Sequence, residues 1–178
     1  MKKRTSLAGL ILALGLTVLS ACGGGGSGEM QGSPRTGTAV LKIETTGVLA
    51  QGTMIGGIVV TGVLPSGVTV KATPDVQNHS VLVTDSGVVA ASGVTKANAS
   101  AFATYDPATG KVSILVYDQD GFGIGEFVTV TCDVASDASP TAGNFGLEGF
   151  TPKDLNGAQI DGLTPGYTVD IHDTRSTL

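Results

Sequence analysis

The chain has 178 residues, of which 41% are hydrophobic, 14% are charged and 27 are glycines. Abundant valine and threonine with few charges favour an all-β domain and exclude a helical or disordered protein. The formal net charge of the whole chain is −5. Three of the 10 basic residues precede Cys22, so the part of the chain that follows Cys22 has a net charge of −8. Such a chain repels phosphate backbones, so we exclude nucleic acid as a partner.

The first residues predict a secretion signal. Three basic residues at positions 2–4 precede an apolar core over 7–19 and small residues that end at Cys22. Roughly a dozen apolar residues are fewer than the ~20 that a transmembrane helix needs. We therefore expect residues 1–21 to be a removable signal peptide.

The end of this segment, Leu19-Ser20-Ala21-Cys22, resembles the lipobox of bacterial lipoproteins. The resemblance implies that the Cys22 thiol receives a diacylglyceryl group and that cleavage falls just before it. A thiolate suits this alkylation because it is a strong nucleophile. An ordinary signal peptide with an incidental cysteine is the alternative. Gly23 stands where an aspartate would resemble the inner-membrane retention signal, so we expect a lipid anchor in the outer membrane of a Gram-negative envelope, with a Gram-positive surface as the alternative.

Residues 22–37 predict a flexible tether behind the lipid-bearing cysteine. The run GGGGSGEMQGSPRTG has almost nothing to bury. Its root-mean-square span is roughly 20 Å. Function is therefore expected to reside in a single domain over residues 38–178.

The first part of that domain predicts short strands. Residues 38–45 alternate between apolar and polar side chains, as in a half-exposed strand. Residues 54–63 are more continuously apolar and fit a strand that is covered on both sides. A Pro-Ser-Gly turn at 65–67 then leads into a short strand over 68–72.

A polar loop is expected over 74–80 before the next strands. Residues 81–92 hold one or two strands around an Asp-Ser-Gly turn. Residues 99–105 predict a strand that brings Phe102 to the core, with Tyr105 as a further core candidate.

The domain is organised around residues 111–134, which follow a DPATG hairpin loop at 106–110. Two apolar sets recur at every second residue and predict two core strands. The sets are Val112, Ile114 and Val116, then Val128, Val130, Cys132 and Val134. Residues between them supply the positive-φ and side-chain-capped positions of a chain reversal. These residues are Asp118, Asp120, Gly121, Gly123 and Gly125.

Beyond the central pair we expect a loop over 137–143, a strand over 145–151, an Asn-Gly turn at 154–157 and a closing strand over 167–171. Eight or nine short strands at roughly 8–12-residue spacing indicate a β-sandwich or jelly roll.

The order of these features resembles the cohesin domain. The resemblance is strongest over residues 93–134: a strand bearing Phe and Tyr, a glycine hairpin, a strand ending in Asp, a GxGxGE-like turn and a further strand. Residues 49–68 and the turn at 154–157 also fit, so the likeness covers 38–173. It implies an eight- or nine-stranded jelly-roll sandwich, close in structure to a set of carbohydrate-binding modules.

The resemblance also implies a partner. Cohesin domains bind dockerin modules on one sheet face. The chain departs from the cellulosomal pattern because we expect a single domain on a lipid anchor, and no interface motif transfers residue by residue. Dockerin binding is therefore one candidate among extracytoplasmic protein partners.

The acidic turn at Asp118 and Asp120 raises the question of a calcium site. An EF-hand is excluded because it would need oxygen ligands at Phe122 and Thr129, which lack a suitable donor. A looser metal site of Asp118, Asp120 and Glu126 is a weaker candidate than a turn stabilised by aspartate side chains. The GxGxG run lacks the spacing and helix of a dinucleotide fingerprint, so we expect no cofactor.

No catalytic constellation is found, and we expect no enzymatic activity. Cys132 is expected to be a buried core residue rather than a redox group. His79 and His172 lack neighbouring ligands in the sequence and are expected at the surface. No serine lies in a GxSxG elbow, and the carboxylates do not suggest a glycosidase pair.

Aromatic residues bear on sugar binding, because exposed Trp and Tyr rings pack against pyranose C–H groups. There is no Trp, and the candidates are Tyr105, Tyr117 and Tyr167. The leading hypothesis is a non-enzymatic surface lipoprotein whose cohesin-like domain binds an extracytoplasmic protein. The alternative is a carbohydrate-binding module that acts on envelope or extracellular polysaccharide.

Overall fold

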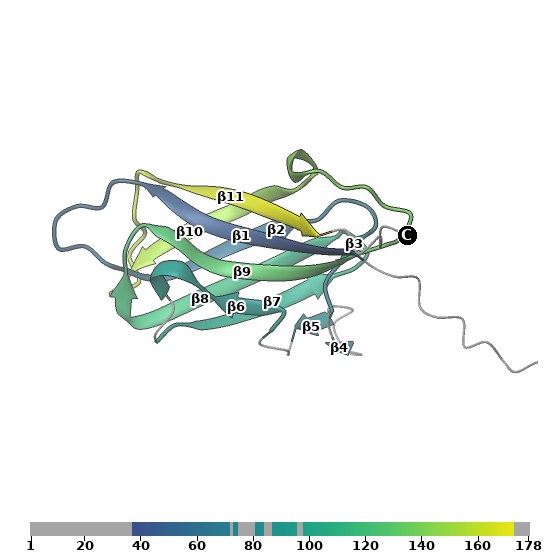
Figure 1. The fold of residues 1–178 in the computed structure, drawn as a ribbon. Helices are drawn as coiled ribbons and strands as arrows, with labels where there is room; N and C mark the ends of the chain where they lie inside the picture. The colour runs from purple at the N-terminus through teal and green to yellow at the C-terminus, as the bar shows by residue number, and fades with distance from the viewer. Residues whose placement is uncertain (1–36, 72, 75–80, 84–86, 96–97, 173–178) are drawn as a thin grey trace, which may run out of the picture. The chain divides into compact units, whose positions relative to one another are not determined.

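A computed structural model describes residues 37–172, apart from 72, 75–80, 84–86 and 96–97. These residues contain eleven strands and two short 3-10 helices. The strands form two sheets that pack face to face (Figure 1). Every strand pair is antiparallel, so the predicted all-β sandwich is confirmed. The predictions for the signal peptide, Cys22, most of the tether, the loop around His79 and the Asp-Ser-Gly turn lie outside the described residues.

The first sheet has the order β11-β1-β9-β3, and β6 also pairs with β9. Its strands are β1 (Gly37–Gly47), β3 (Val68–Thr69), β6 (Val89–Ala91), β9 (Gly125–Val134) and β11 (Leu163–His172). β1 and β11 pair in an unbroken register along their length, with Thr38 opposite His172 and Gly47 opposite Leu163.

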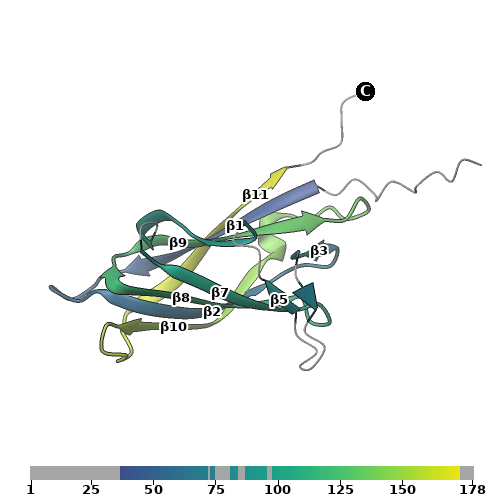
Figure 2. The same cartoon turned by 90° about the horizontal axis from the view of Figure 1, so that it is seen from below.

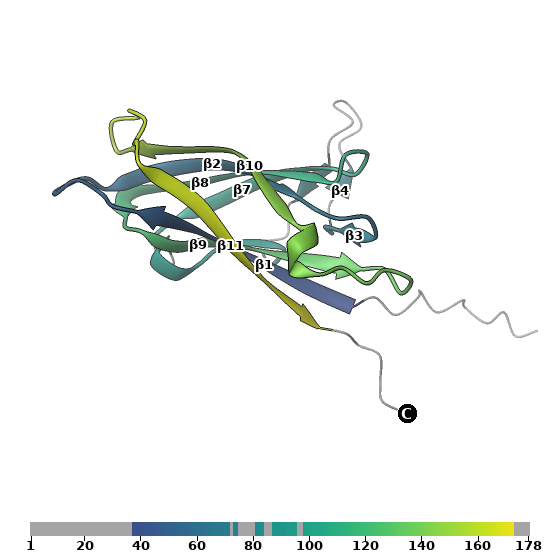
Figure 3. The same cartoon turned by 90° about the horizontal axis from the view of Figure 1, so that it is seen from above.

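The second sheet has the order β10-β2-β8-β7-β5-β4. Its strands are β2 (Ile55–Val63), β4 (Thr73–Pro74), β5 (Val81–Val83), β7 (Ser100–Asp106), β8 (Lys111–Phe122) and β10 (Gly146–Asp154). The 3-10 helices are η1 (Gly93–Thr95) and η2 (Ala142–Asn144). Figures 2 and 3 show the two sheets as separate layers, with β2, β8 and β10 in one and β1, β9 and β11 in the other.

The core lies between the sheets and is built mainly from alternate residues of β1, β2, β8 and β9. All the apolar positions predicted for the two central strands are at most 5% exposed. They are Val112, Ile114, Val116, Val128, Val130, Cys132 and Val134. This part of the prediction is confirmed, because alternation along a strand decides which side chains share a face.

The two central strands do not pair with each other. β8 pairs with β2 and β7 in the second sheet, whereas β9 pairs with β1, β3 and β6 in the first. The predicted chain reversal between them includes Gly121 and Gly125, whose φ angles are 76° and 138°. The reversal therefore carries the chain across the core from one sheet to the other.

Two predictions about burial are wrong. Phe102 is 60% exposed, whereas Tyr105 on the same strand is 4% exposed; residues three apart on a strand face opposite sides, so both could not enter the core. The strand predicted to be covered on both sides is covered on one. Ile58 and Val60 are fully buried, but Val59 between them is 43% exposed.

The predicted turns form where glycine and aspartate occur. The DPATG loop joins β7 to β8, and the last residue pair of these two strands before the loop is Asp106 opposite Lys111. At the Asn-Gly turn the N–H of Gly157 donates to the carbonyl of Asp154 over 3.0 Å. No helix among the described residues is long and apolar enough to span a membrane.

Candidate functional site

The outer face of the second sheet presents a row of apolar side chains. Val59 on β2 lies opposite Leu115 on β8, and Leu115 lies opposite Phe102 on β7. The three residues are 43%, 42% and 60% exposed. Because directly opposite residues are neighbours on one face of a sheet, they form a continuous strip that we call the apolar row. A contiguous exposed patch of this kind marks an interaction surface more often than scattered apolar residues do.

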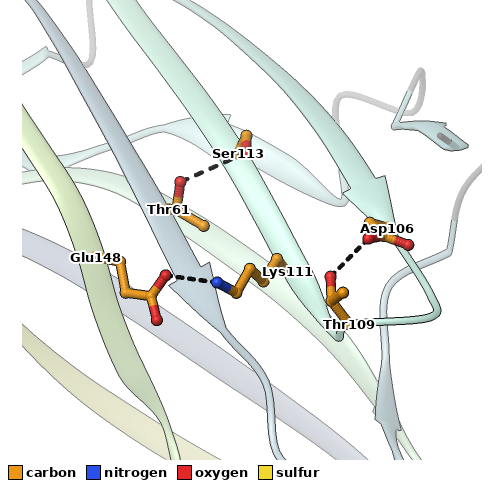
Figure 4. A network of polar contacts seen from close by, with 6 residues as sticks. All are labelled: Thr61, Asp106, Thr109, Lys111, Ser113 and Glu148. Carbon is orange, nitrogen blue, oxygen red and sulfur yellow. Dashed lines mark hydrogen bonds and ion pairs between the residues drawn. The ribbon is translucent and has the colours of Figure 1, made fainter. Parts of the chain in front are cut away.

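Polar side chains border the apolar row on one side. Thr61 lies opposite Ser113, and their hydroxyl oxygens are 3.4 Å apart. Further along, the Lys111 ammonium donates to the Glu148 carboxylate over 2.7 Å, which joins β8 to β10 across the end of β2 (Figure 4). We call these four residues the polar rim. An apolar centre with a polar rim is the usual anatomy of a protein interface.

The loop beyond the polar rim is held by its own aspartate. The hydroxyl of Thr109 donates to the Asp106 carboxylate over 2.6 Å (Figure 4). The Ala108 N–H donates to the other oxygen of the same carboxylate over 3.0 Å. These two hydrogen bonds, the first more than the second, hold the pKa of the Asp106 carboxyl below its usual value. The loop is therefore pre-organised at this end of the face.

On the other side of the apolar row lies Tyr117, which is 51% exposed. It stands opposite Gly57 on β2, and Gly57 in turn stands opposite Lys153 on β10. Because Gly57 has no side chain, the Tyr117 ring has an open flank. A groove of about 350 Å³ occupies this position and is also lined by Gln119 and Leu155. We call it the Tyr117 groove.

The three tyrosines predicted as sugar-binding candidates do not come together. Tyr105 is buried, and burial is the main cause of its raised pKa. The Tyr167 hydroxyl donates to the carbonyl of Phe145 over 2.6 Å, so its polar end is engaged within the fold. Tyr117 is the tyrosine whose ring is most exposed and borders a groove.

The three acidic metal candidates are not gathered into one cluster. The Asp118 carboxylate accepts a hydrogen bond from the Asp120 N–H over 2.9 Å, and the Asp120 carboxylate accepts one from Asn98 over 2.9 Å. Glu126 lies on β9 in the other sheet, opposite Glu44. Across the described residues, no group of three or more His, Cys, Asp or Glu side chains could hold a metal ion. The Asp118 carboxylate therefore caps a backbone N–H of its own turn, whereas the Asp120 carboxylate links that turn to Asn98.

Cys132 occupies the core as predicted. It is fully buried and unpaired with another cysteine, and burial raises the pKa of its thiol to about 12. His172 is exposed at the end of β11. Neither residue lies near the apolar row in the strand register.

Sequence reasoning missed the apolar row, although part of the signal was present. The alternation that buries Val112, Ile114 and Val116 also requires Leu115 and Tyr117 to point to the opposite face. The sequence of one strand does not show whether that face is exposed to solvent or covered by another part of the protein. Only the register with β2 and β7 brings Val59 and Phe102 beside them.

Comparisons with known proteins add little to this picture. No family model matches the chain, and no curated protein matches it. A solved structure described as a non-cellulosomal cohesin from the hyperthermophilic archaeon Archaeoglobus fulgidus is similar, with a TM-score of 0.48 and 14% identity over 72% of this chain and 75% of that chain. These values do not establish membership of the cohesin family, so the cohesin resemblance of the sequence stays a prediction.

Proposed function

We propose that this chain is a non-enzymatic, lipid-anchored protein of the cell envelope whose β-sandwich binds another extracytoplasmic protein through the outer face of the second sheet. The observation that carries the proposal is the apolar row of Val59, Leu115 and Phe102. Large apolar side chains on a rigid sheet lose little conformational entropy on binding and release water from their surfaces.

The contrast with the first sheet supports this choice of face. In the corresponding row there, Lys42 on β1 lies between Thr129 on β9 and Thr168 on β11. Lys42 also forms an ion pair with Asp170, with 2.6 Å between nitrogen and oxygen. A polar, well-solvated face of this kind gains little from being covered by a partner.

The chemistry of the face limits the partner. It has to present an apolar surface for the apolar row and hydrogen-bonding groups for the polar rim. The net charge of −8 after Cys22 favours encounter with a basic surface. A dockerin-like module is the candidate that the sequence resemblance implies.

The surroundings of the Cys132 thiol and of the Asp118 and Asp154 carboxylates support a protein without enzymatic activity. The Cys132 thiol is buried and has a raised pKa. The carboxylates of Asp118 and Asp154 accept hydrogen bonds from backbone N–H groups of their own turns. Each of these residues has a structural role.

Membrane anchoring is tested at Cys22. The chain and its Cys22→Ser variant would be expressed in a bacterium fed a labelled fatty acid, and membranes would be separated by density. We expect label and outer-membrane fractionation for the unchanged chain only. Label on the Cys22→Ser variant, or its retention in the same fraction, would contradict the anchor.

Docking is tested with variants of the apolar row. Purified full chain, Leu115→Asp, Phe102→Asp and the control Thr168→Asp on the opposite face would serve as bait for envelope proteins, with affinity then measured for the captured partner. A partner on the apolar row binds the first two variants at least about tenfold more weakly and binds the control normally. Equal binding by all four proteins would exclude this face.

A further inference from the structure

The Tyr117 groove contains chemistry that the apolar row lacks. Tyr117, Gly57 and Lys153 lie opposite one another in a single row across β8, β2 and β10. Adjacent strands are about 4.8 Å apart, so the tyrosine and lysine stand about 10 Å apart with a bare glycine between them. A β-carbon at Gly57 would approach one atom within 4 Å, the carbonyl oxygen of Val116 at 3.3 Å, so the space above Gly57 is open.

Polar groups surround this opening. The residues that line the groove include Gln119, Lys153 and Asp154, whose side chains carry an amide, an ammonium group and a carboxylate. One oxygen of Asp154 accepts hydrogen bonds from the N–H groups of Asn156 and Ala158, at 2.9 and 2.8 Å, which holds the carboxylate in place. The groove therefore offers an exposed aromatic ring together with hydrogen-bond donors and acceptors on a rigid frame.

We infer that the Tyr117 groove binds a sugar unit of a polysaccharide, with the pyranose ring stacked on Tyr117. Sugar C–H groups pack on an aromatic face, and sugar hydroxyls both donate and accept hydrogen bonds. The mixed set of Gln119, Lys153 and Asp154 satisfies such hydroxyls.

Other occupants match the groove less well. An anionic ligand would meet the carboxylate of Asp154, and an apolar peptide side chain would remove Lys153 and Asp154 from water without giving them partners. The groove adjoins the apolar row through Val59 and Leu115, but Phe102 does not line it. The sugar site shares Val59 and Leu115 with the proposed protein-binding face, so a Phe102 variant separates the two experimentally.

The first experiment would use the purified full chain on an array of neutral, amino and acidic oligosaccharides. The oligosaccharide retained most strongly would then be titrated while tyrosine emission is followed, because the chain has no Trp. We expect saturable binding that changes the emission of the exposed Tyr117. An array on which no oligosaccharide is retained overturns the inference.

Four variants locate the site. Tyr117→Ala, which removes the ring, and Gly57→Val, which fills the space beside it, are each expected to weaken sugar binding at least about tenfold. Tyr117→Phe keeps the ring and is expected to bind within about threefold of the unchanged chain. Phe102→Asp, which disrupts the apolar row, is expected to leave sugar affinity unchanged.

The remaining outcomes separate the groove from the protein-binding face. Far-ultraviolet circular dichroism of each variant confirms that the sandwich is intact before affinities are compared. Sugar binding that survives both Tyr117→Ala and Gly57→Val overturns the inference, as does equal loss in Phe102→Asp. Loss of a captured protein partner in Tyr117→Ala, without sugar binding by the unchanged chain, would assign the groove to the protein interface instead.

Discussion

The hydroxyl group of Tyr167 on β11 donates a hydrogen bond to the carbonyl oxygen of Phe145 over 2.6 Å. Phe145 directly follows η2, and its side chain is buried in the core. The same hydroxyl lies 3.4 Å from the carbonyl of Ala142 within η2. The edge strand of the first sheet is thereby tied to the segment that leads into β10 of the second.

Removing this hydroxyl should destabilise the sandwich. We expect Tyr167→Phe to lower the free energy of unfolding by about 1 kcal/mol, because the Phe145 carbonyl loses its donor in a partly buried place. Tyr117→Phe is the matched control, since the Tyr117 ring is half-exposed, and it should change stability by less than about 0.5 kcal/mol. Urea denaturation of both variants measures the difference; equal effects would argue against the hydrogen bond.

Two glycines with positive φ angles should respond differently to substitution. Gly93 has φ +55°, and an added β-carbon would overlap the carbonyl oxygen of Glu126. Gly52 has φ +82°, and an added β-carbon there would have nothing within 4 Å. Gly52→Ala therefore carries the backbone strain alone, about 1 kcal/mol, whereas Gly93→Ala adds a clash with β9 and should cost at least about 2 kcal/mol. Thermal unfolding ranks the two variants, and a Gly52→Ala loss equal to or above that of Gly93→Ala would refute the steric argument.

Cys132 should be inert in the folded protein. Burial raises the pKa of its thiol from 9.0 to about 12, so the reactive thiolate is scarce at pH 8. In a Cys22→Ser background we expect a thiol-specific disulfide reagent to label the chain only after urea is added. Because the folded pKa lies above the unfolded one, this group also makes stability fall as the pH rises from about 9 towards 12. Rapid labelling without urea would show that Cys132 is accessible.

The Asp106 carboxyl should titrate at lower pH than an unperturbed aspartate. Its pKa is lowered first by the Thr109 hydroxyl and then by the Ala108 N–H. Because the pKa of Asp106 is lower in the folded protein than in the unfolded chain, the ionised carboxylate stabilises the fold at pH values above the unfolded pKa of 3.8. This stabilisation is lost as the pH falls through the folded pKa. We expect Thr109→Val to raise the Asp106 pKa towards 3.8, measured by carbon-13 NMR of the carboxyl group.

Asp170 provides the control for this titration. Its pKa is also lowered, but by hydrogen bonding to Lys42 and by the charge of Lys42. Thr109→Val should leave Asp170 unchanged, whereas Lys42→Met should raise the pKa of Asp170 and not that of Asp106. A shift of both carboxyls in either variant would point to a general change in the fold.

The buried positions of the central strands could be predicted because side-chain alternation is a local property of an extended backbone. The burial of Val112 and Val130 could be predicted without knowing the position of any other segment. The turns at Asp106 and Asp154 were equally local, since an aspartate side chain caps N–H groups only two to four residues away.

The choice of sheet was not local. β8 and β9 follow each other in the chain, yet each hydrogen-bonds to strands from distant segments, β8 to β2 and β9 to β1. Alternation along a strand separates two faces, but it does not say which face meets water. For this reason the prediction that Phe102 enters the core is wrong.

The sequence by itself determined the strand pattern, the burial of the two central strands and the common face of Leu115 and Tyr117. Only the tertiary structure decided that this face is solvent-exposed, that Val59 and Phe102 extend it and that Gly57 opens a groove beside Tyr117. The physical reason is that a binding face of a sheet is made of rows across strands. The register between segments far apart in the chain, which no single strand encodes, decides which residues share a row.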